Sequence, residues 1–141
     1  MIRTADAEWK GNLKEGNGTM KLGSGAYEGN YSFQSRFENG PGTNPEELVA
    51  AAHAGCFAMF LSNVLATAGH TPERVHAKAN VDFGRDDKGP LIQKIEIVCE
   101  VKAPGLDQAK LQELGTKAKE GCPISRALAA VPSITLSIKL A

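Results

Sequence analysis

The stretch that decides the fold is T-N-P-E-E-L-V-A-A-A-H-A-G-C-F-A-M-F-L-S-N-V-L-A-T-A-G, residues 43–69. It begins with the signals of a helix N-terminus, because Asn44 can cap and Pro45 suits the first helical position. The apolar run continues to about Ala68, and Gly69 is a plausible left-handed C-cap. We therefore expect one long helix here.

This helix is apolar nearly all round, which predicts burial on several sides and a central place in the fold. Its longest apolar part, Leu48–Leu65, is interrupted by polar side chains and is interpreted as too short and too polar to span a bilayer. The small residues between Ala50 and Gly55 would let a second backbone approach closely.

The flanking sequence indicates strands. A Gly-rich N-terminal segment predicts three antiparallel strands, the third at Tyr31–Phe37 with Arg36 on the face opposite the aromatics. The expected elements after the helix are strands at 75–83, 95–101 and 134–140 and helices near 107–121 and 123–130; the other expected N-terminal strands are Ala5–Lys10 and Thr19–Leu22. The predicted order is βββ-α-ββ-αα-β, an α+β fold of antiparallel sheets around a long central buried helix, in a single domain over residues 1–141.

Composition narrows the classes of function. The 141 residues carry 16 basic and 16 acidic side chains, and their balance argues against nucleic acid or an anionic membrane as a partner. The N-terminus lacks the apolar region of a signal peptide. The three cysteines form no zinc spacing, and an odd count without a secretion signal favours a reducing cytoplasm.

Two cysteines are candidates for chemistry. Cys56 lies within the long helix, where a lone Cys is commonly a small buried hydrophobe. Cys122 lies at a predicted helix N-terminus, where the positive end of the dipole favours thiolate, although it can also be an ordinary capping residue. Cys99 alternates with inward-facing isoleucines and is expected in the core.

Arg36 and Glu46 are the candidate charged partners. A thiol that reduces peroxide needs a guanidinium to hold it as thiolate, and a carboxylate can orient that guanidinium through a bidentate pair. Taken singly, each is more simply a solvated charge or a dipole partner. Glu46 and Cys56 are ten residues apart, about 15 Å along one helix. Two helices crossing antiparallel near Ala51 would bring Glu46 of one subunit near Cys56 of the other, which predicts an obligate dimer.

His53 offers an alternative, because it shares a helix face with Cys56 and a Cys–His pair can support acyl transfer. The sequence identifies no third orienting group, and this spacing rarely gives good hydrogen-bond geometry. A Cys–His hydrolase would survive Cys122→Ser and lose activity with His53→Ala.

Together these residues resemble the OsmC (osmotically inducible protein C) family of thiol peroxidases. The motifs that carry the resemblance are W-K-G at 9–11, G-N-G-T at 16–19, S-R-F-E at 35–38, G-T-N-P-E-E-L at 42–48, A-A-H-A-G-C-F at 51–57 and G-C-P-I-S at 121–125. They match OsmC proper better than its sister branch, the organic hydroperoxide resistance proteins, because G-N-G-T lacks an arginine and A-A-H replaces Gly-Tyr.

The resemblance implies an intertwined, cytoplasmic homodimer that reduces organic hydroperoxides and, less readily, hydrogen peroxide during osmotic and oxidative stress. It makes Cys56 the peroxidatic and Cys122 the resolving cysteine, and it adds Arg36 and Glu46, not Glu47, as catalytic residues. An external dithiol, for which a lipoyl-type dithiol is a candidate, reduces the disulfide back to the two thiols. The resemblance implies no cofactor and no metal. By dipole alone, Cys122 would be the attacking thiol.

A redox sensor or stress-response binding protein would use the same disulfide without fast turnover. Turnover with excess dithiol distinguishes it from a peroxidase, since a sensor would oxidise once and cycle slowly.

Overall fold

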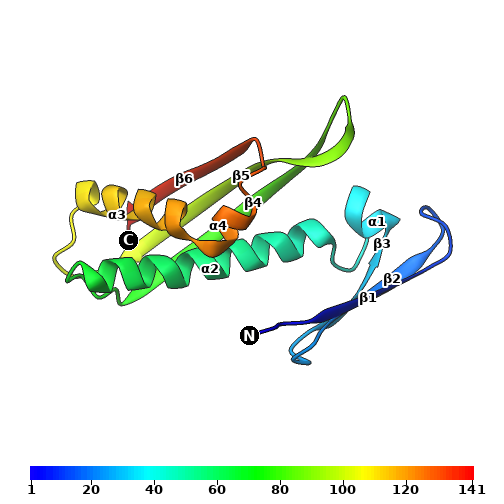
Figure 1. Ribbon diagram of the computed structural model, residues 1–141, viewed down its shortest axis with the longest axis horizontal. Coiled ribbons are helices and arrows are strands. Elements are labelled where there is room, and N and C mark those ends of the chain that lie inside the picture. Colours follow the sequence, from blue (N-terminus) through cyan, green and yellow to red (C-terminus); the bar gives the residue numbers. More distant parts are fainter. The chain divides into compact units, whose positions relative to one another are not determined.

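The computed structural model describes residues 1–141 and divides them into two compact units, Met1–Leu48 and Val49–Ala141, which are described separately (Figure 1). The first unit contains β1 (Ala5–Lys10), β2 (Asn17–Leu22), β3 (Glu28–Ser32) and α1 (Phe33–Phe37). Helix α2 (Pro45–Thr67) begins in the first unit and continues into the second. The second unit adds β4 (Arg74–Asp86), β5 (Gly89–Lys102), α3 (Gln108–Gly121), α4 (Pro123–Ala127) and β6 (Ser133–Leu140). The α+β class is confirmed, and the single domain stays a prediction.

The first unit is the expected antiparallel meander in the order β1-β2-β3. Gly18 of β2 pairs with Trp9 on one side and Tyr31 on the other, and the two rings lie 5.2 Å apart across it. A Cβ at Gly18 would come within 2.5 Å of the Tyr31 ring and 2.9 Å of the Trp9 ring. The missing side chain is therefore what lets the two aromatics meet.

The prediction of a strand through Phe37 is wrong, because β3 ends at Ser32 and a helical turn, α1, follows. Ser32 caps this turn: its hydroxyl accepts from the Ser35 N–H at 3.1 Å, and the Ser35 hydroxyl accepts from the Ser32 N–H at 2.9 Å. Phe33 and Phe37 then lie one turn apart with ring centroids at 4.8 Å. Arg36 consequently lies on a helix and not on the polar face of a strand.

The predicted ends of α2 are confirmed. The Asn44 side chain accepts from the Glu47 N–H at 2.8 Å, which is the expected N-cap bond. At the other end, Gly69 has φ +88° and donates to Ala66, while His70 donates to Leu65 at 2.9 Å. This pair of bonds forms a Schellman motif, which the left-handed glycine permits.

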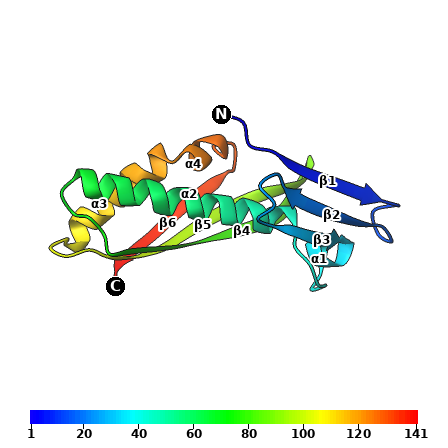
Figure 2. The ribbon, with the colours of Figure 1, turned by 90° about the horizontal axis from the view of Figure 1, so that it is seen from below.

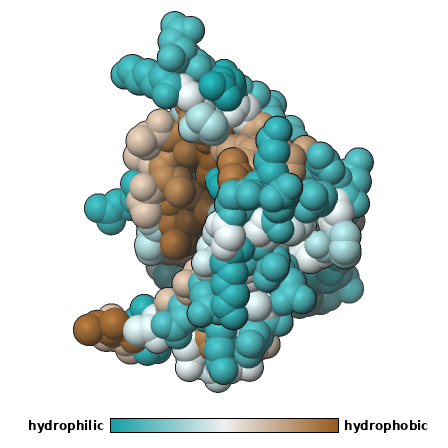
Figure 3. Space-filling model, turned by 90° about the vertical axis from the view of Figure 1, so that its right-hand side faces the viewer, coloured by the Kyte–Doolittle hydropathy of each residue, from teal (hydrophilic) through white to brown (hydrophobic).

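The prediction that α2 is buried on several sides is wrong for a single chain. Only four of its residues are buried, and they follow each other at intervals of four: His53, Phe57, Leu61 and Leu65. Met59, on another side, is 78% exposed. Figure 3 shows one face of the molecule, on which hydrophobic side chains, in brown, lie at the surface among hydrophilic ones. An apolar face of α2 is therefore left uncovered.

Helix α2 also bears on the expectation about a membrane span. Its 23 residues, with a mean hydropathy of 1.7 in the most apolar window, would by length and composition be enough to cross a membrane. The expectation that the segment is too short and too polar was thus wrong. Its buried stripe packs into the core of the second unit, however, and we describe it as a core helix.

The sheet of the second unit has the order β4-β5-β6. Strands β4 and β5 are antiparallel as predicted, but β6 runs parallel to β5, so this sheet is mixed and not antiparallel throughout. The connection from Lys102 to Ser133 contains α3 and α4, which gives the chain the long crossover that a parallel pair requires. The predicted inward face of β5 is confirmed, because its members are all buried: Ile95, Ile97, Cys99 and Val101.

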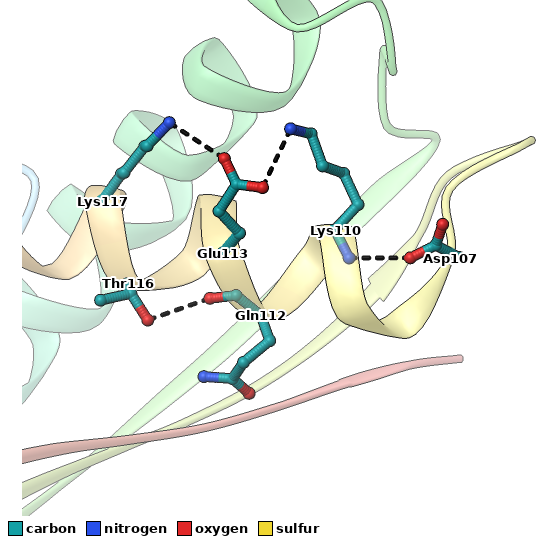
Figure 4. Close-up of polar contacts among 6 residues, drawn as sticks. All are labelled: Asp107, Lys110, Gln112, Glu113, Thr116 and Lys117. Atoms are coloured by element: carbon teal, nitrogen blue, oxygen red, sulfur yellow. Dashed lines mark hydrogen bonds and ion pairs between the residues drawn. The ribbon is translucent and has the colours of Figure 1, made fainter.

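Helices α2 and α3 pack side by side in opposite directions on this sheet (Figures 1 and 2). The side of α3 that faces the core is the predicted one, with Leu111, Leu114 and Ala118 buried. Asp107 caps the helix, and on its exposed side Glu113 pairs with two lysines, one in each neighbouring turn (Figure 4). Helix α4 ends at Ala127, three residues before the predicted end.

Candidate active site

The two candidate cysteines meet in the second unit. Cys56 comes from the middle of α2, and Cys122 lies between α3 and α4, where it is the C-cap of one helix and the N-cap of the other. Their sulfur atoms are 3.3 Å apart. A disulfide requires about 2.05 Å, so a small movement would suffice to form the bond. Cys99 is 1% exposed within the core, as predicted.

The two thiols differ in exposure. Cys122 is fully buried, with 0% of its surface exposed, whereas Cys56 is only partly buried. Burial raises the pKa of Cys56, and the neighbouring Cys122 raises it further. In the single chain, the more exposed of the two cysteines is therefore the weaker acid.

The pKa of Cys122 is shifted in the opposite direction, downward. Burial acts to raise its pKa, but the N–H and hydroxyl of Ser125, the Cys56 thiol and the N–H of Ile124 together lower it. The expected effect of the helix N-terminus is therefore present. Ser125 is the third residue of α4, so its N–H and side chain lie in the turn that follows Cys122.

His53 extends this group of polar side chains. Its Nε2 lies 2.7 Å from Oγ of Ser125, and both residues are buried. Its Nδ1 is buried without a hydrogen-bond partner. Burial lowers the pKa of His53, which favours the neutral imidazole. The hydrogen-bond partner of His53 is thus Ser125, not Cys56 as the Cys–His alternative requires.

Arg36 and Glu46 form the predicted bidentate pair in the first unit. The Arg36 Nη2 donates to Oε1 of Glu46 at 2.8 Å, and Nε donates to Oε2 at 3.3 Å. The Glu46 side chain is 12% exposed and that of Arg36 is 33% exposed. Glu47 instead accepts from the Thr43 hydroxyl at 2.6 Å, which distinguishes the two neighbouring glutamates.

A cavity of ≈ 360 Å³ lies beside Arg36 in the same unit. Its walls are mainly apolar, with Trp9, Leu13, Phe33 and Phe37 among the lining residues. The guanidinium also lies over the Phe37 ring, 5.3 Å from its centroid. The surroundings of Arg36 therefore suit an apolar molecule that carries one polar group.

The structure thus brings the four predicted residues together as two pairs, one in each unit. One contact was missed: the bond between His53 and Ser125. The spacing Cys122-x-x-Ser125 was a usable signal, since the third residue of a helix faces its N-cap. His53 is 72 positions away from Ser125, so its pairing had no signal in the sequence.

Comparison with known proteins defines the class. The family model described as OsmC-like protein matches residues 38–137, and the chain belongs to this family. Among its relatives, Peroxiredoxin OsmC of Escherichia coli (strain K12) is 43% identical over 139 residues, which are 98% of this chain and 96% of the relative.

The sister branch is also found. The organic hydroperoxide resistance protein of Xanthomonas axonopodis pv. citri is 35% identical over 100 residues, covering 70% of this chain and 68% of the relative. The crystal structure of organic hydroperoxide resistance protein OhrB of Bacillus subtilis has a TM-score of 0.73 and 27% identity, covering 96% of this chain and 98% of that one. The predicted resemblance and the OsmC-like α+β fold are thereby confirmed.

Proposed function

We propose that this protein is a thiol peroxidase that reduces organic hydroperoxides and, less readily, hydrogen peroxide. The observation that carries the proposal is the pair of cysteines with sulfur atoms 3.3 Å apart, one partly exposed and one buried. The relatives named for peroxiredoxin activity and for organic hydroperoxide resistance support it.

In this mechanism the Cys56 thiolate attacks the O–O bond of the hydroperoxide. The sulfur takes one oxygen and becomes a sulfenic acid, while the other oxygen leaves in the alcohol. Cys122 then attacks the Cys56 sulfur, forms the disulfide and expels water. An external dithiol, for which a lipoyl-type dithiol is our candidate, reduces the disulfide and completes the cycle.

We assign attack to Cys56 although the pKa of Cys122 is the lower one in the single chain. Access supports this assignment, since a hydroperoxide cannot reach a sulfur that is fully buried. A positive charge beside Cys56 would lower its pKa, and Arg36, held by Glu46, is our candidate for that charge. The same guanidinium would stabilise the departing oxygen.

We further propose that the active protein is an intertwined homodimer in the cytoplasm, in which Arg36 and Glu46 of one subunit serve Cys56 of the other. The uncovered apolar face of α2, with Met59 78% exposed, supports a second copy as its cover. The small residues around Ala51 would let two such helices cross closely. Sedimentation as a monomer at micromolar concentration would contradict this part.

The first experiment compares wild type, Cys56→Ser and Cys122→Ser for consumption of cumene hydroperoxide with dihydrolipoamide or dithiothreitol. We expect Cys56→Ser to lose activity and Cys122→Ser to accumulate one sulfenic acid, trapped with dimedone. A sulfenic acid on Cys122 in the Cys56→Ser protein, formed at the wild-type rate, would reverse the assigned roles. Equal consumption by all three proteins would reject the peroxidase.

Glu46→Gln and Glu47→Gln form a matched pair for the charged partners. Glu46 forms the bidentate pair with Arg36, whereas Glu47 accepts from the Thr43 hydroxyl. Glu46→Gln should therefore slow sulfenic acid formation, by roughly tenfold or more if the guanidinium loses its position. Glu47→Gln should remain near wild type in this step. Similar rates for both variants would remove Glu46 from the mechanism.

A further inference from the structure

The second unit contains two buried polar residues, Ser125 and His53, that the mechanism above leaves without a role. Ser125 is the third residue of the helix that follows Cys122, whose sulfur lies 3.3 Å from that of Cys56, and the Ser125 Oγ lies 2.7 Å from Nε2 of His53. We propose that the Ser125 hydroxyl holds Cys122 as a thiolate for disulfide formation, and that His53 positions this hydroxyl. This inference rests on the proposed function, in which Cys122 is the resolving thiol.

Packing alone does not account for His53. It is the first member of the buried stripe of α2, whose other members are phenylalanine and leucine, and it is itself 0% exposed. Burying an imidazole costs free energy unless its nitrogens are hydrogen-bonded, and here one of the two, Nδ1, has no partner. The single bond that His53 makes is directed to the residue beside the buried thiol.

The unpartnered nitrogen also indicates the tautomer. A buried N–H without an acceptor is rarer in proteins than an acceptor without a donor, so Nδ1 is best left unprotonated. The proton of the neutral ring then lies on Nε2, which donates to Oγ of Ser125 at 2.7 Å. With its oxygen occupied in this way, Ser125 is free to donate its own O–H.

We assign the sulfur of Cys122, which is the N-cap three residues before Ser125, as the acceptor for that O–H. The Ser125 hydroxyl is one of the groups that lower the pKa of Cys122 against the effect of its burial. Ser125 is 8% exposed, so few water molecules compete for its proton. In this proposal Ser125 would donate directly to the reacting sulfur, whereas His53 acts through Ser125 and is a positioning residue.

The step that Ser125 and His53 would accelerate is the closure of the disulfide between Cys56 and Cys122. The Cys122 sulfur attacks the Cys56 sulfur, the S–S bond forms and the S–O bond of the sulfenic acid breaks. The Cys56 sulfur is reduced and the Cys122 sulfur is oxidised, and the oxygen leaves as water after taking the proton that Cys122 has lost. A larger thiolate fraction at Cys122 accelerates this attack.

The experiment is a single turnover with one equivalent of cumene hydroperoxide, in which sulfenic acid formation and disulfide closure are followed separately by quenching and mass spectrometry. The variants are Ser125→Ala and His53→Leu, with Ser125→Thr and His53→Gln as rescues that retain a hydroxyl and a side-chain N–H. Thr116→Val is the control, because Thr116 donates only to a carbonyl within α3. Denaturant midpoints are measured for each protein.

We expect Ser125→Ala to slow closure by roughly ten- to a hundredfold, the effect of losing a hydrogen bond to a charged group. His53→Leu should slow it by about three- to tenfold, since it acts indirectly. Sulfenic acid formation should stay near the wild-type rate, and the two rescue variants should recover most of the closure rate. Thr116→Val should close like wild type.

Closure at the wild-type rate in Ser125→Ala would overturn the inference, as would a loss in Ser125→Thr equal to that in Ser125→Ala. A closure rate that followed the denaturant midpoints across all variants would also overturn it, by indicating a structural role alone. If no variant and no wild type formed sulfenic acid, the proposed function would fail as well, which is a separate result.

Discussion

The close approach of α3 to β6 can be tested with a double-mutant cycle on Gly115 and Ile138. Gly115 is buried in the middle of α3, and a Cβ there would lie 2.9 Å from Cδ1 of Ile138. Carbon atoms in contact are normally about 3.5 Å or more apart, so the added methyl is about 0.6 Å too close. Ile138→Val removes that Cδ1 atom.

The expected energies follow from these contacts. Gly115→Ala should gain about 1 kcal/mol in helix propensity and lose about 1–3 kcal/mol to overpacking, a net loss of roughly 1 kcal/mol. Ile138→Val alone should cost about 0.5–1.5 kcal/mol for the lost methyl group. In the double variant the new methyl fills the space of the old one, so its stability should be near that of wild type.

The assay is urea unfolding of the four proteins at one fixed protein concentration, because a dimer would make stability depend on concentration. We expect a favourable coupling energy of about 1–2 kcal/mol. Ile134→Val, on the same strand, is the matched control and should combine additively with Gly115→Ala. Coupling below about 0.5 kcal/mol for Ile138 would refute the close approach, since independent sites add within that margin.

Three further predictions concern single residues. Burial lowers the pKa of His53 below its value in the unfolded chain, so the unfolded state binds the proton first as pH falls. The free energy of unfolding should therefore decrease below about pH 6.5. In His53→Gln, the denaturant midpoints measured at about pH 7.5 and 5.5 should lie closer together than in wild type. Ser32→Ala removes the cap of α1 and should cost about 1 kcal/mol in urea unfolding, whereas Ser24→Ala, in an exposed turn, should cost less. Burial raises the pKa of Cys99 to about 11, so at about pH 8 iodoacetamide should label Cys56 first and Cys99 only after denaturation; labelling of native Cys99 at the rate of Cys56 would contradict its place in the core.

The elements with local signals were predictable from the sequence. The ends of α2 follow from Asn44 and Gly69, whose capping roles need only their neighbours. The failure at Phe33–Phe37 has a physical reason: aromatics at every second position are typical of a strand, but Ser32 and Ser35 close a reciprocal cap that starts a helix. The parallel pairing of β6 depends on a long crossover, and no local pattern reports it.

Some contacts of the candidate site were likewise predictable from the sequence, and others were not. The requirement of a guanidinium for an orienting carboxylate suggested the pair of Arg36 and Glu46, and the resemblance to a family was needed to choose Glu46 over Glu47. Cys56 and Cys122 are 66 residues apart, and the resemblance to a family was needed to bring them together. Ser125 lay inside a quoted motif but had no assigned chemistry, because its role depends on a histidine from a different helix.

In the proposed cycle, the unequal burial of the two cysteines would determine how the disulfide is reduced. In the proposed disulfide, an incoming dithiol can reach the Cys56 side, while Cys122 remains enclosed. The mixed disulfide with the reductant should therefore form on Cys56, and Cys122 should depart. Thiols of low pKa depart faster, so the groups that lower the pKa of Cys122 would favour its release as well as its attack. The buried hydroxyl of Ser125 would then accelerate both the formation of the disulfide and its reduction.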